Sequence, residues 1–480
     1  MAGPLIIQGG MGVGVSSWAL ARAVSRLGQM GVVSGTALDT VFVRRLADGD
    51  PGGHLRRALG AFPVPAIARE ALQRWYRPGG RAPGEPYPVL TLMQRVLDPA
   101  RQRLIVLANF AEVFLAREGH DGWVGINYLT KIQIPTLPSL YGAMLAGVHD
   151  VLMGAGIPRD IPGAIDELAA HRPAAIRLDV QGGTGADDEM LEFDPATIWD
   201  GAPPAALARP RFLAIVSTDS LATIMARKAT GRVDGFIVEG PTAGGHNAPP
   251  RSKASVNERG EPLYGERDIA DLAKIAALGL PFWLAGGTGS PAGLREALAA
   301  GATGIQAGTL FAFAEESGLR ADLKRRVLAC VREGRADVLT DGRASPTGFP
   351  FKTVALEGTL SEDDVYAARG RICDLGYLRT AFRDDDGSIG YRCSSAPVEG
   401  FVRKGGAEEE AAGRKCLCNA LTANIGLAQV RDGVEERPLL TSGDDLLRLD
   451  EFLGGRETYS TADAVEYLLT GVKAGADQSG

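Results

Sequence analysis

The stretch 282-FWLAGGTGSPAGLREALAAGATGIQAGTLF-311 contains two apolar segments separated by a helical pattern. Each apolar segment ends in glycine, at Gly286-Gly287 and at Gly308. Between them Ser290 is placed to cap a helix, with Pro291 in its first turn and Gly301 at its end. A strand, a helix and a second strand in this order form the unit from which parallel sheets are built.

Short, nearly continuous apolar segments of the same kind recur along the rest of the chain, at residues 4–10, 31–35, 123–127, 150–156, 175–180, 212–218 and 235–240. They are rich in Val and Ile, which is typical of strands buried on both faces of a parallel sheet. Helical patterns separate them, for example after Ser16 or Ser17 up to Gly28, and over 267–279. The alternation predicts an α/β fold.

Nine candidate strands are one more than a closed barrel of eight requires. The segment 175–180 is followed by QGGTGADDEMLEFDP, which indicates a hairpin inserted between barrel strands four and five. The other eight predict a (β/α)8 TIM barrel. The alternative is a doubly wound dinucleotide-binding sheet, but residues 9–17, GGMGVGVSS, lack the third glycine or alanine of its fingerprint and an acidic residue about 20 positions later.

Two segments exceed what a barrel needs. Residues 45–105 contain a Pro/Gly loop at 77–88 and predict an insertion after strand two, a lid or a subunit contact. We expect residues 1–329 to form the barrel and 330–480 a C-terminal extension packed on it. Within the extension, SPTGFPFK (345–352) either reaches over the active site or lies elsewhere, and the last eight residues, 473–480, are predicted to be disordered.

The composition is that of a soluble globular enzyme. A net charge of −7 argues against nucleic-acid and anionic-membrane binding, and no apolar segment is long enough to span a bilayer. The first residues lack the basic segment of a signal peptide, and five cysteines at uneven spacing indicate a reducing compartment. We therefore expect a cytoplasmic protein.

Four of the cysteines, Cys373, Cys393, Cys416 and Cys418, follow one another in the extension. The single residue within C-L-C differs from the two residues of common zinc and iron–sulfur motifs, and no histidine lies nearby. We expect reduced, structural thiols and no metal.

The functional residues of a barrel of this type lie where its strands end. The turns Gly286-Gly287 and Gly308-Thr309 are either tight turns or a phosphate site made of backbone N–H groups beside a helix N-terminus. Gln8, Asn127 and Gln306 either hydrogen-bond a planar heterocycle or cap loops. His246, in AGGH after the sixth barrel strand, is either a turn residue or an acid/base group, since the ordinary pKa of histidine lies close to neutral pH.

The ordered set PLIIQGGM (4–11), VGIN (124–127), VEGPTAGGH (238–246) and 282–311 resembles the nitronate monooxygenase family, formerly called 2-nitropropane dioxygenases. The resemblance covers roughly residues 4–315 with gaps. It implies an FMN-dependent (β/α)8 barrel, and related barrels act as enoyl reductases. The insertion and the extension exceed what a minimal member needs.

The resemblance also implies roles for individual residues. Gly10 and Met11 would lie against the flavin ring, with Asn127 hydrogen-bonded to it and His246 as the catalytic acid/base. Gly244 and Gly245 would let the backbone pass close under the cofactor. The remaining implied flavin contacts are Gln8 and Gln306 near the ring, and Gly286, Gly287, Gly308 and Thr309 at the phosphate.

Three functions follow from this set. The first is oxidation of nitronates or nitroalkanes by dioxygen to a carbonyl compound and nitrite. The second is an NAD(P)H-dependent flavin reductase that acts on an enoyl thioester or quinone. The third is a flavin-free module that binds a phosphometabolite or serves in assembly. The expected partners are a small substrate and dioxygen or NAD(P)H, and a homo-oligomer is possible.

Overall fold

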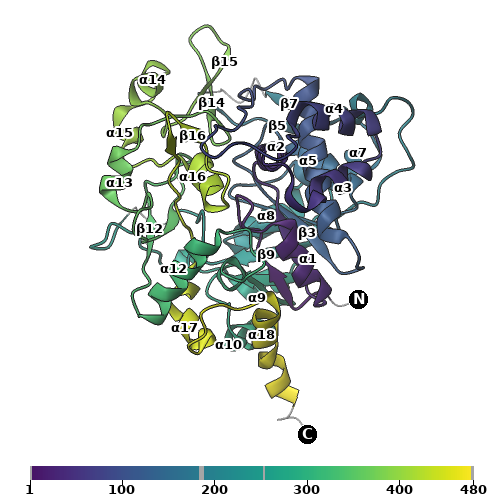
Figure 1. Ribbon diagram of the computed structural model, residues 1–480. Helices are drawn as coiled ribbons and strands as arrows, with labels where there is room; N and C mark the ends of the chain where they lie inside the picture. The colour runs from purple at the N-terminus through teal and green to yellow at the C-terminus, as the bar shows by residue number, and fades with distance from the viewer. Residues whose placement is uncertain (1–2, 183–188, 252–254, 477–480) are drawn as a thin grey trace.

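Eight parallel strands form a barrel surrounded by helices (Figure 1). The computed structural model describes residues 3–182, 189–251 and 255–476. The barrel strands are β1 (Ile6–Gln8), β2 (Gly31–Ser34), β3 (Val124–Leu129), β4 (Asp150–Gly154), β8 (Arg211–Val216), β9 (Gly235–Glu239), β10 (Phe282–Ala285) and β11 (Gly304–Ala307). All eight coincide with apolar segments of the sequence, and the predicted TIM barrel is confirmed.

The strand order is β1-β11-β10-β9-β8-β4-β3-β2, and the two end strands meet. A parallel bridge joins Ile7 to Met30, where the Gln8 N–H donates to the Met30 carbonyl at 2.9 Å. The barrel is therefore closed and has no dinucleotide-binding switch point. Buried side chains fill its interior, among them Ile7, Met30 and the fully buried Trp283.

The apolar segment 175–180, which the sequence analysis excluded from the barrel, forms part of the hairpin predicted between barrel strands four and five. Strand β5 (Ala174–Arg177) pairs antiparallel with β7 (Met190–Phe193). The short strand β6 (Val180–Gln181) between them pairs instead with a strand of the extension. The hairpin therefore joins the barrel to the C-terminal part of the chain.

The barrel helices are α1 (Trp18–Arg26), α2 (Leu38–Ala47), α5 (Pro99–Arg117), α6 (Thr136–Leu145), α7 (Ile161–Ala169), α8 (Asp219–Lys228), α9 (Leu272–Ala276), α10 (Pro291–Ala299), α11 (Thr309–Ala312) and α12 (Ala321–Arg332). The Ser290 hydroxyl caps α10 as predicted, accepting from the Gly293 N–H at 3.0 Å. The helix predicted over 267–279 is too long. Asp271 caps α9 by accepting from the Lys274 N–H, and Ile269 is 75% exposed instead of facing the core.

The predicted insertion 45–105 has different boundaries in the structure, because α2 continues to Ala47 and α5 begins at Pro99. The residues between these helices form a 3-10 turn, η1 (Pro51–Gly53), two helices and a long loop over 76–98. The two helices are α3 (His54–Gly60) and α4 (Pro65–Trp75). Both pack on the barrel side of the molecule, and α3 contacts α5.

The extension lies along one side of the barrel, green to yellow in Figure 1, and returns beneath it. The elements of the extension are β12 (Val338–Asp341), β13 (Phe351–Val354), α13 (Asp363–Ala368), β14 (Thr380–Arg383), β15 (Ile389–Arg392), α14 (Val398–Arg403), α15 (Glu408–Ala411), α16 (Leu417–Asn424), β16 (Val430–Arg431), β17 (Val434–Glu435), η4 (Asp444–Arg448), α17 (Leu449–Leu453) and α18 (Thr461–Ala476). Two further 3-10 turns, η2 (Pro195–Ile198) and η3 (Glu266–Asp268), lie in loops of the barrel.

The C-terminal helix α18 contacts α10 and α1. It continues through residues 473–476, where disorder was predicted, because no proline interrupts the helical backbone there. The rest of that prediction, 477–480, lies outside the described residues.

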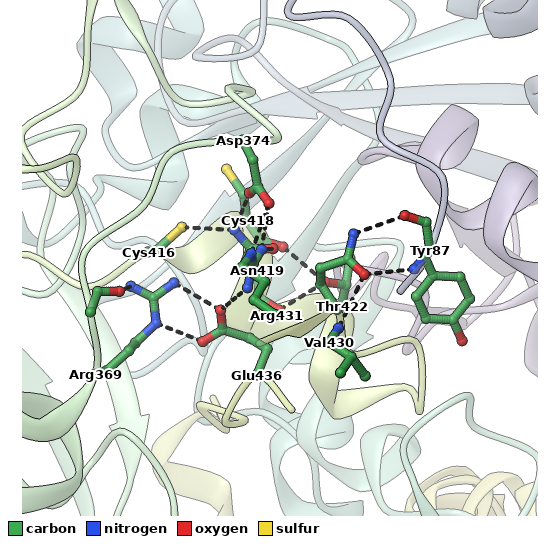
Figure 2. Close-up of polar contacts among 12 residues, drawn as sticks. Tyr87, Arg369, Asp374, Cys416, Cys418, Asn419, Thr422, Val430, Arg431 and Glu436 are labelled. Atoms are coloured by element: carbon green, nitrogen blue, oxygen red, sulfur yellow. Dashed lines mark hydrogen bonds and ion pairs between the residues drawn. The ribbon is translucent and has the colours of Figure 1, made fainter. Parts of the chain in front are cut away.

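The insertion loop and the extension are joined by a polar network (Figure 2). The Gln429 carboxamide accepts from the Tyr87 N–H at 2.7 Å and donates to the Tyr87 carbonyl at 3.1 Å. Behind it Arg431 bridges Asp374 and Glu436, and Arg369 binds Glu436 through two hydrogen bonds. Two segments far apart in sequence are thereby fixed to each other. Across the described residues, no helix is long and apolar enough to cross a membrane.

Candidate active site

A cavity of about 230 Å³ lies at the carboxyl end of the barrel strands. Loops after β1, β3, β9, β10 and β11 line it, together with residues of the extension. It contains all but one of the residues that the sequence placed at the site, namely Gly10, Met11, Asn127, Gly244, Gly245, His246, Gly286, Gly287, Gln306, Gly308 and Thr309. The structure therefore brings these residues together around one space.

Gln8 is the exception. Its side chain is fully buried below the cavity, where its amide donates to the Ser16 hydroxyl at 2.7 Å. Its carbonyl oxygen accepts from the Val32 N–H at 3.0 Å. Because both ends of the carboxamide bind within the protein, Gln8 holds the first loop in place, and its side chain does not line the cavity.

The two remaining amide side chains face the cavity. The carbonyl oxygen of Gln306 is buried and has no hydrogen-bond partner among the described residues. Asn127 donates to the Tyr128 carbonyl at 3.2 Å, and a side chain at Gly10 would overlap its Cβ. An unpaired acceptor in a buried wall is costly unless a ligand donor satisfies it. The wall therefore fits the polar edge of a planar heterocycle.

The glycine turns after β10 and β11 form an open cradle of backbone. Gly286 and Gly287 have φ values of +84° and +73°, a region that favours glycine. A Cβ on Gly308 would point toward Met11, 3.7 Å from its sulfur, and would fill the space between them. Within the described chain, the backbone N–H groups of Gly286, Gly287 and Gly308 donate to no backbone acceptor. This arrangement fits a phosphate group.

Residues of the extension cover the outer side of that cradle. The Thr309 hydroxyl accepts from the Gly443 N–H at 3.0 Å and from the Ser442 hydroxyl at 3.2 Å. The Asp445 carboxylate accepts from the Gly289 N–H at 3.1 Å, and Arg448 pairs with it at 3.1 Å. The helix N-terminus at Ser290 thus already has an anionic neighbour, so a phosphate here would depend on the glycine turns rather than on the helix.

The loop that carries His246 is held by the extension on both sides. Gly245 donates its N–H to the Thr441 hydroxyl at 2.9 Å, and its carbonyl accepts from the Lys352 N–H at 2.9 Å. At Gly244 an added Cβ would lie 2.7 Å from the Gly443 nitrogen, so only glycine allows this approach. The segment 345–352 does reach over the site, and β13 forms a bridge to His246 through Phe351.

His246 is held in one orientation. Its Nε2 shares a 2.7 Å hydrogen bond with the Ser345 hydroxyl, and its ring packs edge-on against Phe351 at 4.9 Å between centroids. Burial, helped by the positive charge of Lys131, lowers the pKa of His246 to about 4. The imidazole is therefore neutral at pH 7 and can accept a proton, although it is a weaker base than a free histidine.

Glu239 is a site residue that the sequence analysis did not single out. It is the last residue of β9 and faces both the main cavity and an adjoining cavity of about 240 Å³, which His246 also lines. Burial raises the pKa of its carboxyl to about 7. A carboxyl at the end of an otherwise apolar strand was the signal that could have identified it.

Cys418 lines the same cavity from the side of the extension. Behind it the Cys373 and Cys393 thiols share a hydrogen bond, and all five cysteines are free thiols. Over the described residues, no group of three or more His, Cys, Asp or Glu side chains has an arrangement that holds a metal ion.

Comparisons with known proteins agree with this architecture. Residues 201–338 match the family model of nitronate monooxygenases, a range that includes AGGH and both glycine turns, and the resemblance is confirmed there. No curated protein matches the chain in sequence.

Solved structures that resemble this chain over its whole length include the following two. FabK from Thermotoga maritima is 16% identical, with a TM-score of 0.52 over 100% of this chain and 95% of that one. A nitroalkane oxidase from Streptomyces ansochromogenes is 14% identical, with a TM-score of 0.47 over 99% and 98%. The first of these shows a shared fold.

Proposed function

We propose that this chain is an FMN-dependent oxidoreductase that oxidises nitronates and nitroalkanes with dioxygen. One observation carries the proposal: His246, the two glycine turns and the unpaired Gln306 acceptor border the same cavity at the carboxyl end of the barrel. When bound, FMN supplies the redox chemistry of such a reaction, accepting electrons from the substrate and passing them to dioxygen.

The residues of the chain have separate tasks in this proposal. The backbone of Gly286, Gly287 and Gly308 would hold the phosphate, while Met11 and Gln306 would contact the ring. His246, neutral and fixed by Ser345, would take the proton from the carbon next to the nitro group. Side chains of the extension, among them Phe351, Leu378 and Leu417, line part of the cavity and would limit the access of water to the reacting atoms.

A second candidate function uses the same cofactor but reduces its substrate instead of oxidising it. NAD(P)H would be the reductant and an enoyl thioester or a quinone the acceptor. Glu239 favours it, because a carboxyl with a pKa of about 7 keeps a proton near neutral pH and could donate it to a reduced product. FabK and an enoyl reductase domain of MlnA from Bacillus amyloliquefaciens are among the structures that resemble this chain.

Two measurements test the proposal. Protein purified without added cofactor should be yellow, and a colourless preparation that also fails to bind added FMN removes both candidates in favour of a flavin-free module. Oxygen uptake with propyl-2-nitronate is then compared with NAD(P)H consumption in the presence of enoyl and quinone acceptors. Nitronate-dependent oxygen uptake supports the first candidate. Rapid anaerobic bleaching by NAD(P)H with no response to nitronate supports the second.

A further inference from the structure

A further cavity, of about 540 Å³, lies beside the candidate active site and has no role so far. We call it the vestibule. It is bounded by the loop after β3, the hairpin segment 178–181, residues 346–348, and residues 376–381, 391–394 and 410–414 of the extension. Tyr377 and Leu378 line both the vestibule and the main cavity. The two spaces therefore adjoin across a thin wall.

The vestibule contains four cationic side chains without ionic partners. Lys131, Arg379, Arg392 and Arg414 line it, and among the described residues none of the four forms a salt bridge. Arg392 binds the Lys404 carbonyl at 2.5 Å and the Gln181 side chain at 2.7 Å. Arg414 binds the Ser345 carbonyl at 2.6 Å. Their hydrogen-bond partners are neutral acceptors, which orient a guanidinium without cancelling its charge.

The remaining cations are similar. Arg379 donates to the Gly376 carbonyl at 3.1 Å and to the Met93 carbonyl, and it lies over the Tyr391 ring. Lys131 forms no hydrogen bond or salt bridge with the described residues, and its ammonium lies 5.1 Å from the centre of the Phe349 ring. Burial lowers the pKa of both Arg379 and Arg414, and for Arg414 it does so although the Asp341 and Glu410 carboxylates act in the opposite direction.

The charges in the vestibule do not balance. Its described lining includes two acidic side chains, Asp179 and Glu410, against four cations. The excess of two positive charges matches a phosphate monoester, which carries close to two negative charges near pH 7. Apolar side chains such as Leu178, Val180 and Phe401 line the rest and suit a hydrocarbon segment.

We propose that the vestibule binds the phosphate-ester end of a substrate whose other end reaches the candidate active site. This inference rests on the proposed function only in taking the ligand to be the substrate. Guanidinium groups also bind carboxylates, so the test includes that source of negative charge. Tyr377 and Leu378 separate the vestibule from the main cavity. The hydroxyl of Tyr377 is held by a hydrogen bond with the Thr40 hydroxyl at 2.7 Å. In this proposal the substrate therefore passes beside Leu378.

The test is calorimetric titration of the full chain with hexyl phosphate, hexanoate and hexan-1-ol at constant ionic strength, with and without saturating FMN. We expect the Kd of hexyl phosphate to be about tenfold lower than that of hexanoate. Hexan-1-ol should give no measurable binding. FMN should leave the hexyl phosphate affinity unchanged, because the two phosphates occupy different places. This readout needs no turnover, so it is independent of whether nitronate or NAD(P)H is the true co-substrate.

Variants locate the site. Lys131→Gln removes a cation that forms no hydrogen bond with the described residues, and Arg392→Gln removes one that belongs to the extension. Each should weaken hexyl phosphate binding about fivefold or more. Arg456→Gln is the control, since Arg456 also binds carbonyls and covers a phenylalanine ring but lies outside the vestibule, where it pairs with Asp463. Equal affinities for the phosphate and the carboxylate, displacement by FMN, or an unchanged Lys131→Gln variant would overturn the proposal.

Discussion

His246, the proposed general base, is held in one orientation and has a lowered pKa. It is fixed by Ser345 and Phe351, which is favourable for proton transfer, yet burial and Lys131 lower its pKa to about 4. From the sequence alone an ordinary histidine pKa was expected. The difference arises because the extension, which lies far away in the sequence, covers the ring.

The first prediction concerns the acid limb of the pH profile. Because protonated His246 cannot accept a proton, kcat/KM on a neutral nitroalkane should fall only as the pH approaches about 4, and not near 6.5. Lys131→Gln removes a positive charge and should move that limb to higher pH. Steady-state rates from pH 4 to 8 measure both effects.

His246→Asn is the companion experiment. FMN content should be retained, and turnover of the neutral nitroalkane should fall by about a hundredfold or more, the usual size of a general-base contribution. The preformed nitronate, already deprotonated, should lose much less. Equal losses on the two substrates would contradict the role of His246 as a base.

Glu239 provides the second prediction, which concerns stability. Its folded pKa of about 7 exceeds the ordinary value of 4.5. Between these values the native state binds more protons than the unfolded state, so Glu239 lowers the free energy of unfolding as pH rises from about 4.5 to 7. Glu239→Gln should therefore be more stable than the wild type by on the order of 2 kcal/mol at pH 8, with little difference at pH 5.

Urea unfolding at the two pH values measures this difference. Glu296→Gln, an exposed position on α10, is the control and should change stability equally little at both. A Glu239→Gln effect that is the same at pH 5 and pH 8 would show that the carboxyl is not shifted.

The strands were the most predictable elements. Each barrel strand is buried on both faces, so its apolar segment stands out locally, and glycine or a polar residue marks its end. The cap at Ser290 was equally local. The length of helix α9 was not predictable from the sequence. The helical pattern of apolar residues includes Ile269, but this side chain is exposed in the structure and lies outside the helix. Contacts between the AGGH loop and residues 441–445 have no local signal at all.

The third prediction tests that contact between elements. Gly244→Ala would place a methyl group 2.7 Å from the Gly443 nitrogen, so the two backbones must separate. We expect a loss of about 1–3 kcal/mol in stability and a drop in turnover, because His246 moves with the loop. Gly265→Ala, in the same β9–α9 connection, has open space around it and should behave as wild type in thermal unfolding and in rate.

At the scale of the whole molecule, contacts join the insertion, the barrel and the extension. The sequence predicted an insertion that acts as a lid or a subunit contact. The described loop binds the extension through Tyr87 and Gln429, and its role as a lid or a subunit contact stays a prediction. The extension in turn lines both the main cavity and the vestibule. The contact between Tyr87 and Gln429 joins segments more than 300 positions apart in sequence. Hydrophobic periodicity and capping residues are local signals and do not predict such contacts.

The fourth prediction follows from this connection. Gln429→Ala leaves the buried N–H and carbonyl of Tyr87 without partners, which should cost about 1–3 kcal/mol. Urea unfolding should show a single transition at a lower midpoint, since the parts unfold together. Gln73→Ala, an exposed glutamine of α4, should leave the midpoint unchanged. Two separate transitions in the wild type would argue that the extension is an independent unit.

The most direct measurement is a fluorescence titration of the flavin-free chain with FMN, carried out for the wild type and for Gly308→Val. The wild type should bind one FMN per chain. The valine side chain would fill the space toward Met11 and should weaken binding by more than about tenfold while leaving the melting temperature of the flavin-free protein unchanged. Absence of saturable FMN binding, or equal affinity in Gly308→Val, would contradict the placement of a flavin at the mouth of this barrel.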